Sequence, residues 1–238
     1  MVKNISFEKI SLKERLITTI FGGIPNIFFG KKIRNIVYRS LLSRIGNSVN
    51  IQHFVELIGT PSIEIGNQVS LLKGVQINAL GHPNNKINIK DRARLERGVD
   101  IRSLHDTHII IDENAYIGPY VVIAGTGDIK IGKNCLIAPH CGIFANNHIF
   151  SDPTRLIEEQ GTTSKGIVIE DDCWLGHNVT VIDGVKIGKG SIIGAGSVVN
   201  KNIPPFSIAV GTPVRIIRNR LDRQTSNLST SIKSKMQN

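Results

Sequence analysis

The sequence has few aromatic residues, which make up 5% of its 238 residues and include a single Trp. It also has little cysteine. Cys135, Cys141 and Cys173 form no CxxC pair, and their odd number argues against a disulfide framework or a zinc ribbon. Apolar residues still reach 40%, so the core must be built mainly from aliphatic side chains. Such a composition indicates many thin layers of Ile and Val rather than one bulky centre.

Long apolar runs are absent as well. The most apolar early stretch, residues 17–29, is too short to cross a bilayer and contains Gly22, Gly23 and Pro25. The beginning of the sequence lacks the basic region and clean apolar segment of a secretory signal peptide. These features predict a cytoplasmic protein with reduced thiols.

The sequence has few acidic residues relative to basic ones, with 19 Asp and Glu against 29 Lys and Arg. The excess lies at the two ends: residues 1–45 hold nine basic and two acidic residues, and residues 215–238 hold six and one. Nucleic-acid binding needs a basic face with interleaved aromatic residues, which the middle lacks, so no nucleic-acid partner is expected. The basic N-terminal segment is interpreted as a helical cap, with weak association with an anionic membrane surface as the alternative.

An aliphatic residue recurs every six positions through most of the chain. The longest run in register comprises Ile169, Leu175, Val181, Ile187, Ile193 and Val199. Shorter runs begin at Ile65, Ile89, Ile111 and Ile131, and the breaks between them carry turn residues. Four residues after an aliphatic position stands a small residue, and all three cysteines occupy such small positions.

A period of six fits no α-helical stripe, but it fits a short strand followed by a tight corner. Three such sides make a triangular coil, whose aliphatic side chains point inward and stack on the next coil about 4.8 Å away. The cysteines are therefore expected to be packing residues and not nucleophiles. The repeat predicts an all-β protein built as a parallel β-helix.

This repeat resembles the [LIV]-[GAED]-x-x-[STAV]-x pattern of the hexapeptide-repeat proteins, from Val49 to Ile203. The resemblance implies that the parallel β-helix is left-handed, against the usual crossover rule. It also implies a homotrimer with active sites between neighbouring prisms.

The β-helix is expected over residues 49–203, and its longest break is a loop at residues 145–166. Residues 1–48 are expected to form a helical N-terminal cap, and residues 204–220 a turn and a short C-terminal helix. Residues 221–238, rich in Ser, Thr, Asn and Lys, are expected to be a disordered tail. Long loops on a rigid solenoid are usual positions for active sites.

The long loop and the coil after it resemble acetyltransferases of the galactoside, maltose and xenobiotic type. The matching motifs are Asn146-Asn147-His148, Cys173-Trp174-Leu175-Gly176, Lys201-Asn202-Ile203-Pro204-Pro205 and Gly211-Thr212-Pro213. The sequence is also similar to acetyltransferases of bacterial surface-polysaccharide synthesis, including the basic N-terminal extension. The resemblance implies transfer of an acetyl group from acetyl-CoA to a hydroxyl group of a sugar or polysaccharide precursor.

By the same resemblance His148 is the general base. The chemistry needs one, because a sugar hydroxyl is a poor nucleophile until a base takes its proton. The amide of His177 is the implied donor to the oxyanion. Direct transfer in a ternary complex is expected, with no acyl-enzyme and no metal.

The resemblance also implies where acetyl-CoA binds. Its pantetheine arm is expected along one prism edge, and cations are expected near its phosphates. The implied contact residues are Trp174, Gly176, His177, Gly194, Ala195, Lys201 and Arg218.

The acceptor and three alternatives stay open. Gly118-Pro119-Tyr120 lacks the acceptor-binding Asn of the galactoside enzymes. N-acetylation of a nucleotide-linked amino sugar and a non-catalytic scaffold are two alternatives. The third is a gamma-type carbonic anhydrase, which needs three His ligands. His105 and His140 have a suitable spacing for it, but Ala145 stands where the third ligand is expected.

Overall fold

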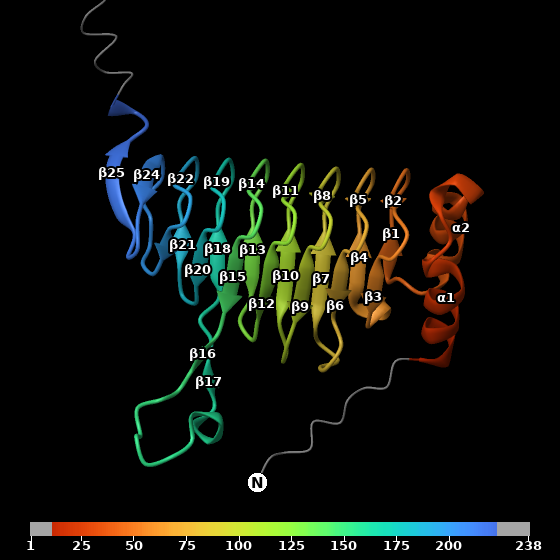
Figure 1. The fold of residues 1–238 in the computed structure, drawn as a ribbon, viewed down its shortest axis with the longest axis horizontal. Helices are drawn as coiled ribbons and strands as arrows, with labels where there is room; N and C mark the ends of the chain where they lie inside the picture. Colours follow the sequence, from red (N-terminus) through yellow and green to blue (C-terminus); the bar gives the residue numbers. More distant parts are fainter. Residues whose placement is uncertain (1–10, 223–238) are drawn as a thin grey trace, which may run out of the picture.

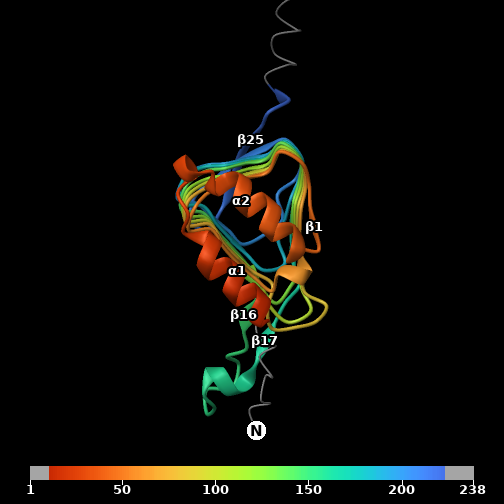
Figure 2. The same ribbon diagram turned by 90° about the vertical axis from the view of Figure 1, so that its right-hand side faces the viewer.

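The main body of the protein is a triangular prism of three parallel β-sheets (Figures 1 and 2). It is known from a computed structural model that describes residues 11–222. Sheet A contains β1 (Arg44–Ile45), β4 (Ile63–Ile65), β7 (Lys86–Ile89), β10 (His108–Ile111), β13 (Ile129–Ile131), β18 (Ile167–Ile169) and β21 (Lys186–Ile187). Sheet B contains β2 (Asn50–Ile51), β5 (Ser70–Leu71), β8 (Arg94–Leu95), β11 (Tyr116–Ile117), β14 (Leu136–Ile137), β19 (Trp174–Leu175), β22 (Ile192–Ile193), β24 (Ser207–Val210) and β25 (Arg215–Asn219). Sheet C contains β3 (Glu56–Ile58), β6 (Gln76–Asn78), β9 (Asp100–Ser103), β12 (Val122–Gly125), β15 (Gly142–Ala145), β20 (Thr180–Ile182) and β23 (Val198–Val199).

The chain visits the sheets in the order A, B, C in every coil. In Figure 2 the N-terminal end faces the viewer, with β1 on the right and the sheet of β25 at the top. The coils therefore turn anticlockwise as they recede, which makes the β-helix left-handed. The predicted fold class is confirmed in its β-helix and its helical N-terminal segment.

The six-residue repeat places one column of aliphatic side chains inside each sheet. In sheet A, Ile65 pairs with Ile89, Ile111 follows, and the column continues through Ile131 and Ile169. These side chains are at most 1% exposed. The three cysteines lie in the same core, and burial raises the pKa of the Cys141 thiol. Their buried positions agree with a packing role.

Two short helices cover the N-terminal end of the prism: α1 (Leu12–Gly22) and α2 (Gly30–Val37). Single 3-10 turns are η1 (Asn26–Phe28), η2 (Tyr38–Ser40), η3 (Thr60–Ser62) and η4 (Ile157–Gln160). Glu14 of α1 points inward, where its carboxylate accepts hydrogen bonds from the Gly59 amide at 2.9 Å and the Thr60 hydroxyl at 3.0 Å. The buried Arg34 of α2 donates from Nε to the Ile51 carbonyl at 3.0 Å.

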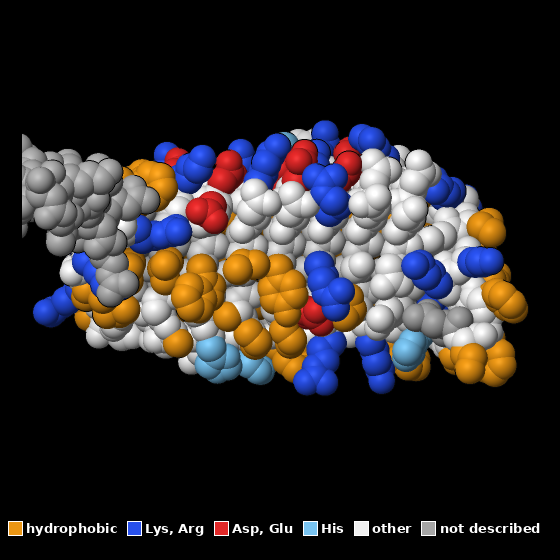
Figure 3. Space-filling model, turned by 90° about the horizontal axis from the view of Figure 1, so that it is seen from above, with side chains coloured by type: hydrophobic (Ala, Val, Ile, Leu, Met, Phe, Trp, Pro, Cys, Tyr) orange, Lys and Arg blue, Asp and Glu red, His pale blue; other side chains and the backbone are white. Residues whose placement is uncertain are grey.

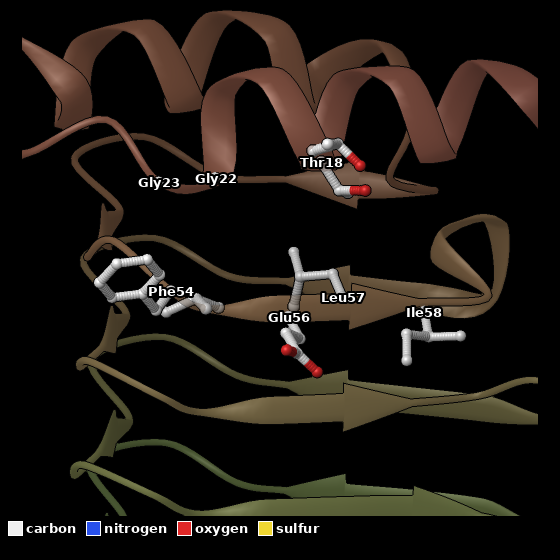
Figure 4. A pocket seen from close by; sticks show the side chains of 9 residues that line it. Thr18, Gly22, Gly23, Phe54, Glu56, Leu57 and Ile58 are labelled. Atoms are coloured by element: carbon white, nitrogen blue, oxygen red, sulfur yellow. The ribbon is translucent and has the colours of Figure 1, made fainter.

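Figure 4 shows α1 lying across the first coil. The Phe54 amide donates to the Gly22 carbonyl at 3.0 Å, which ties the end of α1 to this coil. Between helix and coil lies an open cavity of about 380 Å³, lined by Thr18, Gly23 and Glu56 among others.

The predicted C-terminal helix is wrong. Residues 215–219 form β25, which pairs antiparallel with β24. This segment forms a strand because of its tertiary surroundings. The parallel stack ends at β24 with an open edge, and the chain folds back to pair with that edge. The first strand begins at Arg44, five residues before the predicted start of the β-helix. The predicted disordered tail, residues 221–238, lies almost entirely outside the described residues. Within residues 11–222, no helix is long and apolar enough to cross a membrane.

Candidate functional site

One coil carries a long insertion between sheets C and A. In the coil before it, residues 126–128 connect Gly125 of β12 to Ile129 of β13. In the next coil the partner positions are Ala145 and Ile167, and residues 146–166 make the same step. The extra segment leaves the prism at its C–A corner and projects away from it (Figures 1 and 2).

The root of this loop is an antiparallel hairpin of β16 (Asn147–His148) and β17 (Thr162–Thr163). His148 pairs with Thr162, and the Ile149 amide donates to the Gly161 carbonyl at 3.0 Å. These backbone bonds fix the position of the His148 backbone. The imidazole itself is exposed and has no hydrogen-bond partner within residues 11–222.

The rest of the loop is held by its own side chains. Gln160 donates from Nε2 to the Asp152 carbonyl and accepts from the Asp152 amide at 3.0 Å. Hydrogen bonds from the Thr154 hydroxyl and amide lower the pKa of the Asp152 carboxyl group. Phe150, Leu156 and Ile157 are nevertheless exposed by more than half.

A row of apolar side chains lies on the outer face of sheet B. Tyr116, Leu136, Trp174 and Ile192 occupy neighbouring strands in register. Trp174 is 51% exposed and Leu136 52%. Figure 3 looks onto this face and shows an apolar band with Lys, Arg, Asp and Glu along one long edge, and with His beside Lys and Arg along the other.

The backbone amides of His177 and Ala195 lie at the corner between sheets B and C. Neither amide donates to any group in the described part of the chain. The two preceding coils carry Pro119 and Pro139 at this position, which have no N–H to donate. His177 and Ala195 thus provide two adjacent donors on an exposed edge.

The glycines at this corner have a packing role of their own. A Cβ on Gly176 would lie 2.7 Å from the Ala195 nitrogen, and one on Gly194 would lie 2.6 Å from Cγ1 of Val210. The neighbouring chain segments therefore fill the space beside both glycines. Stacking of the coils is enough to require glycine, and a contact with acetyl-CoA stays a prediction.

A stack of rings along the B–C corner was not expected from the sequence. The rings of Tyr120 and His140 are 5.3 Å apart and nearly parallel, and His140 meets His177 edge-on at 5.4 Å. The Arg97 guanidinium lies 5.5 Å from the Tyr120 ring centroid. The sequence does contain a signal for this stack: Tyr120 and His140 are 20 residues apart, which is the length of one full coil.

Lys201 and Arg218, the two predicted phosphate contacts, lie on different parts of the prism. Lys201 is exposed at the C–A corner, on the same side as the root of the His148 loop. Arg218 is exposed on β25, opposite Ile208 at the C-terminal end of sheet B. The single chain does not bring these two cations together.

His148 and His177 are separated by the width of sheet C. His140 and Asn146, which mark the two corners in the coil of β15, are six residues apart along an extended strand, or about 20 Å. The His148 loop projects further outward from its corner (Figure 2). Within one chain the predicted base and the predicted oxyanion donor therefore do not form one cleft.

The histidines of the alternative metal site do not come together either. His105 follows β9 and His140 precedes β15, so they lie beyond opposite ends of the sheet C strands. Among residues 11–222, no three His, Cys, Asp or Glu side chains form a group that could hold a metal ion.

Residues 166–201 match the family model described as bacterial transferase hexapeptide (six repeats). A probable acetyltransferase of Mycobacterium tuberculosis is 32% identical over 170 residues, which are 68% of this chain and 54% of that protein. The galactoside O-acetyltransferase of Escherichia coli is 37% identical over 119 residues, 50% of this chain and 58% of that enzyme. A putative lipopolysaccharide biosynthesis O-acetyl transferase of the same species is 35% identical over 117 residues, which are 46% of this chain and 60% of that protein.

These matches confirm the resemblance to hexapeptide-repeat acetyltransferases. The matched part of the chain corresponds to less than two thirds of the length of each of these relatives.

Proposed function

We propose that the protein transfers the acetyl group of acetyl-CoA to a hydroxyl group of a sugar or polysaccharide precursor, with His148 as general base. The observation that carries this proposal is the imidazole of His148, exposed on a hairpin at the long insertion and without a partner in the described residues. The similarity to two proteins named O-acetyltransferases supports oxygen rather than nitrogen as the acceptor atom.

The proposed reaction is a single displacement. An unprotonated nitrogen of the His148 imidazole takes the proton of the acceptor hydroxyl while its oxygen attacks the thioester carbon. The tetrahedral oxyanion accepts hydrogen bonds from the free amide of His177, which the protein need not reorganise during the reaction. The carbon–sulfur bond then breaks, and the imidazolium returns its proton to the CoA sulfur.

We propose that this site is completed by a second copy of the chain in a homotrimer. His148 and His177 lie at different corners of one prism, so a neighbour must supply one of them. The apolar row on sheet B and the apolar side chains of the loop are surfaces that such contacts would bury.

Acetyl-CoA is proposed to lie along the B–C corner beside Trp174, His177 and Ala195. Lys201 and Arg218 are exposed cations suited to its phosphates, each from a different side of the prism. In an assembly of prisms, the C–A corner of one copy and the B–C corner of its neighbour can face the same cofactor.

The test is His148→Ala. The kcat should fall by about 10²–10⁴-fold, the usual contribution of a general base, while acetyl-CoA still binds. His82→Ala changes a histidine three coils earlier and should leave kcat unchanged. Near-normal turnover of the His148 variant would end this mechanism.

A further inference from the structure

The outer face of the N-terminal cap is unusually apolar. Leu12, Leu16 and Ile20 follow one another at helical spacing on α1 and are 73%, 52% and 59% exposed. The turn after α1 adds Ile27, Phe28 and Phe29, and α2 adds Ile36; each of these is at least 68% exposed. The end caps of solenoids normally present a polar outer face, so this cap departs from the rule.

These side chains are not used in packing the cap onto the prism. The opposite side of α1 carries the buried Glu14 and Gly22, and α2 turns Gly30 and Arg34 inward. The inward contacts thus use other residues than the exposed stripe. The stripe can be removed without touching the contacts that hold the cap.

The same face is positively charged. Lys13 and Arg15 flank the stripe on α1, and Lys31 and Lys32 are exposed at the start of α2. None of these four side chains takes part in an ion pair within residues 11–222. Glu14 is the one acidic residue between residues 11 and 45, and it is buried. Figure 3 shows apolar and basic side chains together at the helical end of the molecule.

We propose that this end face docks onto the surface of a lipid bilayer that contains anionic lipids. Apolar side chains flanked by Lys and Arg are the composition of an interfacial helix: the apolar groups enter the headgroup region and the cations meet lipid phosphates. A second copy of the chain is a poor occupant, because two such faces would bring like charges together. The docking is independent of acetyl transfer, since the cap contains none of the residues proposed for the reaction.

The experiment uses the full chain and sedimentation with vesicles of phosphatidylcholine, either alone or with 30 mol% phosphatidylglycerol. The wild-type protein should bind the anionic vesicles at least about tenfold more tightly than the neutral ones, and added salt should weaken that binding. One variant combines Leu12→Ser, Leu16→Ser and Ile20→Ser. Another combines Lys31→Glu and Lys32→Glu. The control combines Lys86→Glu and Lys90→Glu, exposed residues on the side of the prism.

Each cap variant should lose at least about tenfold in vesicle affinity. The Ser variant loses the apolar side chains that enter the headgroup region, and the Glu variant loses two basic residues, each of which contributes roughly fivefold near an anionic surface. The control, with the same change in net charge, should bind like the wild type. Thermal unfolding should be unchanged, since the replaced side chains are exposed. Equal binding by the cap variants and the wild type would overturn the proposal. The proposal would also be overturned if the cap only mediated self-association. Light scattering would then show a larger assembly for the wild type, and the Ser variant would abolish it.

Discussion

The two free amides at the B–C corner stand where two other coils carry proline. Because Pro119 and Pro139 fit this position after Gly118 and Ala138, a proline at 177 is compatible with the backbone. His177→Pro therefore removes the N–H together with the imidazole ring, while the path of the backbone is kept. We expect it to lower kcat by about 10²–10³-fold, the usual effect of losing one oxyanion donor.

His177→Ala is the matched variant. It keeps the amide and loses only the ring that meets His140 edge-on. A steady-state comparison of the two variants separates the backbone from the side chain. Equal losses in both would assign the effect to the imidazole ring and remove the amide from the mechanism.

Gly176 tests the packing between coils. A Cβ at this position would lie 2.7 Å from the nitrogen and 3.0 Å from Cα of Ala195, and backbone atoms cannot move away cheaply. Gly176→Ala should lower the free energy of unfolding by about 1–3 kcal/mol, the usual cost of overpacking.

Gly23→Ala is the control for that substitution. Gly23 has an ordinary φ of −84°, and its added Cβ would meet Phe54 at 3.8 Å. We expect a change within about 0.5 kcal/mol in denaturant unfolding. A Gly176 variant as stable as the wild type would mean that the coils can separate at this corner.

Among the elements, the loop of residues 146–166 can be tested by replacing it with the short connection of the coil before it. Thr-Gly-Asp, the sequence of residues 126–128, spans the same pair of strands there. Because the core columns on both sides stay intact, the variant should keep its circular dichroism spectrum. It should lose acetyl transfer at least as completely as His148→Ala. A shortened protein that still turns over would place the chemistry elsewhere.

The elements also show what a single sequence can and cannot predict. The sequence predicts the core residues correctly, as in the run that begins at Ile65, because inward positions of a coil recur every six residues. The helix predicted within residues 204–220 is a strand instead, since a stretch as short as Arg215–Asn219 carries too little periodicity to distinguish the two. The pairing of this stretch with β24 depends on the open edge of sheet B, which exists only once the prism is built.

For the candidate site, the sequence predicts individual residues but not their arrangement in space. The match around His148 and Trp174 identified the segments. The direction in which the loop leaves the prism depends on coil lengths and corner geometry, so the distance between His148 and His177 could not be inferred. The same holds for the stack of Tyr120 on His140, which needs the register between two coils.

For the whole molecule, a shared active site predicts complementation between two inactive variants. Light scattering should give about three times the 26.1 kDa of one chain. When His148→Ala and His177→Pro chains are co-expressed in equal amounts and assemble at random, about a quarter of all sites combine an intact His148 with an intact neighbouring amide. Activity should therefore recover to about that fraction of wild type. A mixture as inactive as its components would assign both residues to one chain.

The stacking of coils also fixes the distance between the N-terminal cap and the His148 loop. The strands from β3 to β15 lie in five successive coils, so the His148 loop stands about 19 Å along the axis from the first coil, at about 4.8 Å per coil. If the cap rests on a bilayer, this count sets the height at which the site works above it. Adding or deleting one repeat would then change this height by one coil, about 4.8 Å, without altering the residues of the site.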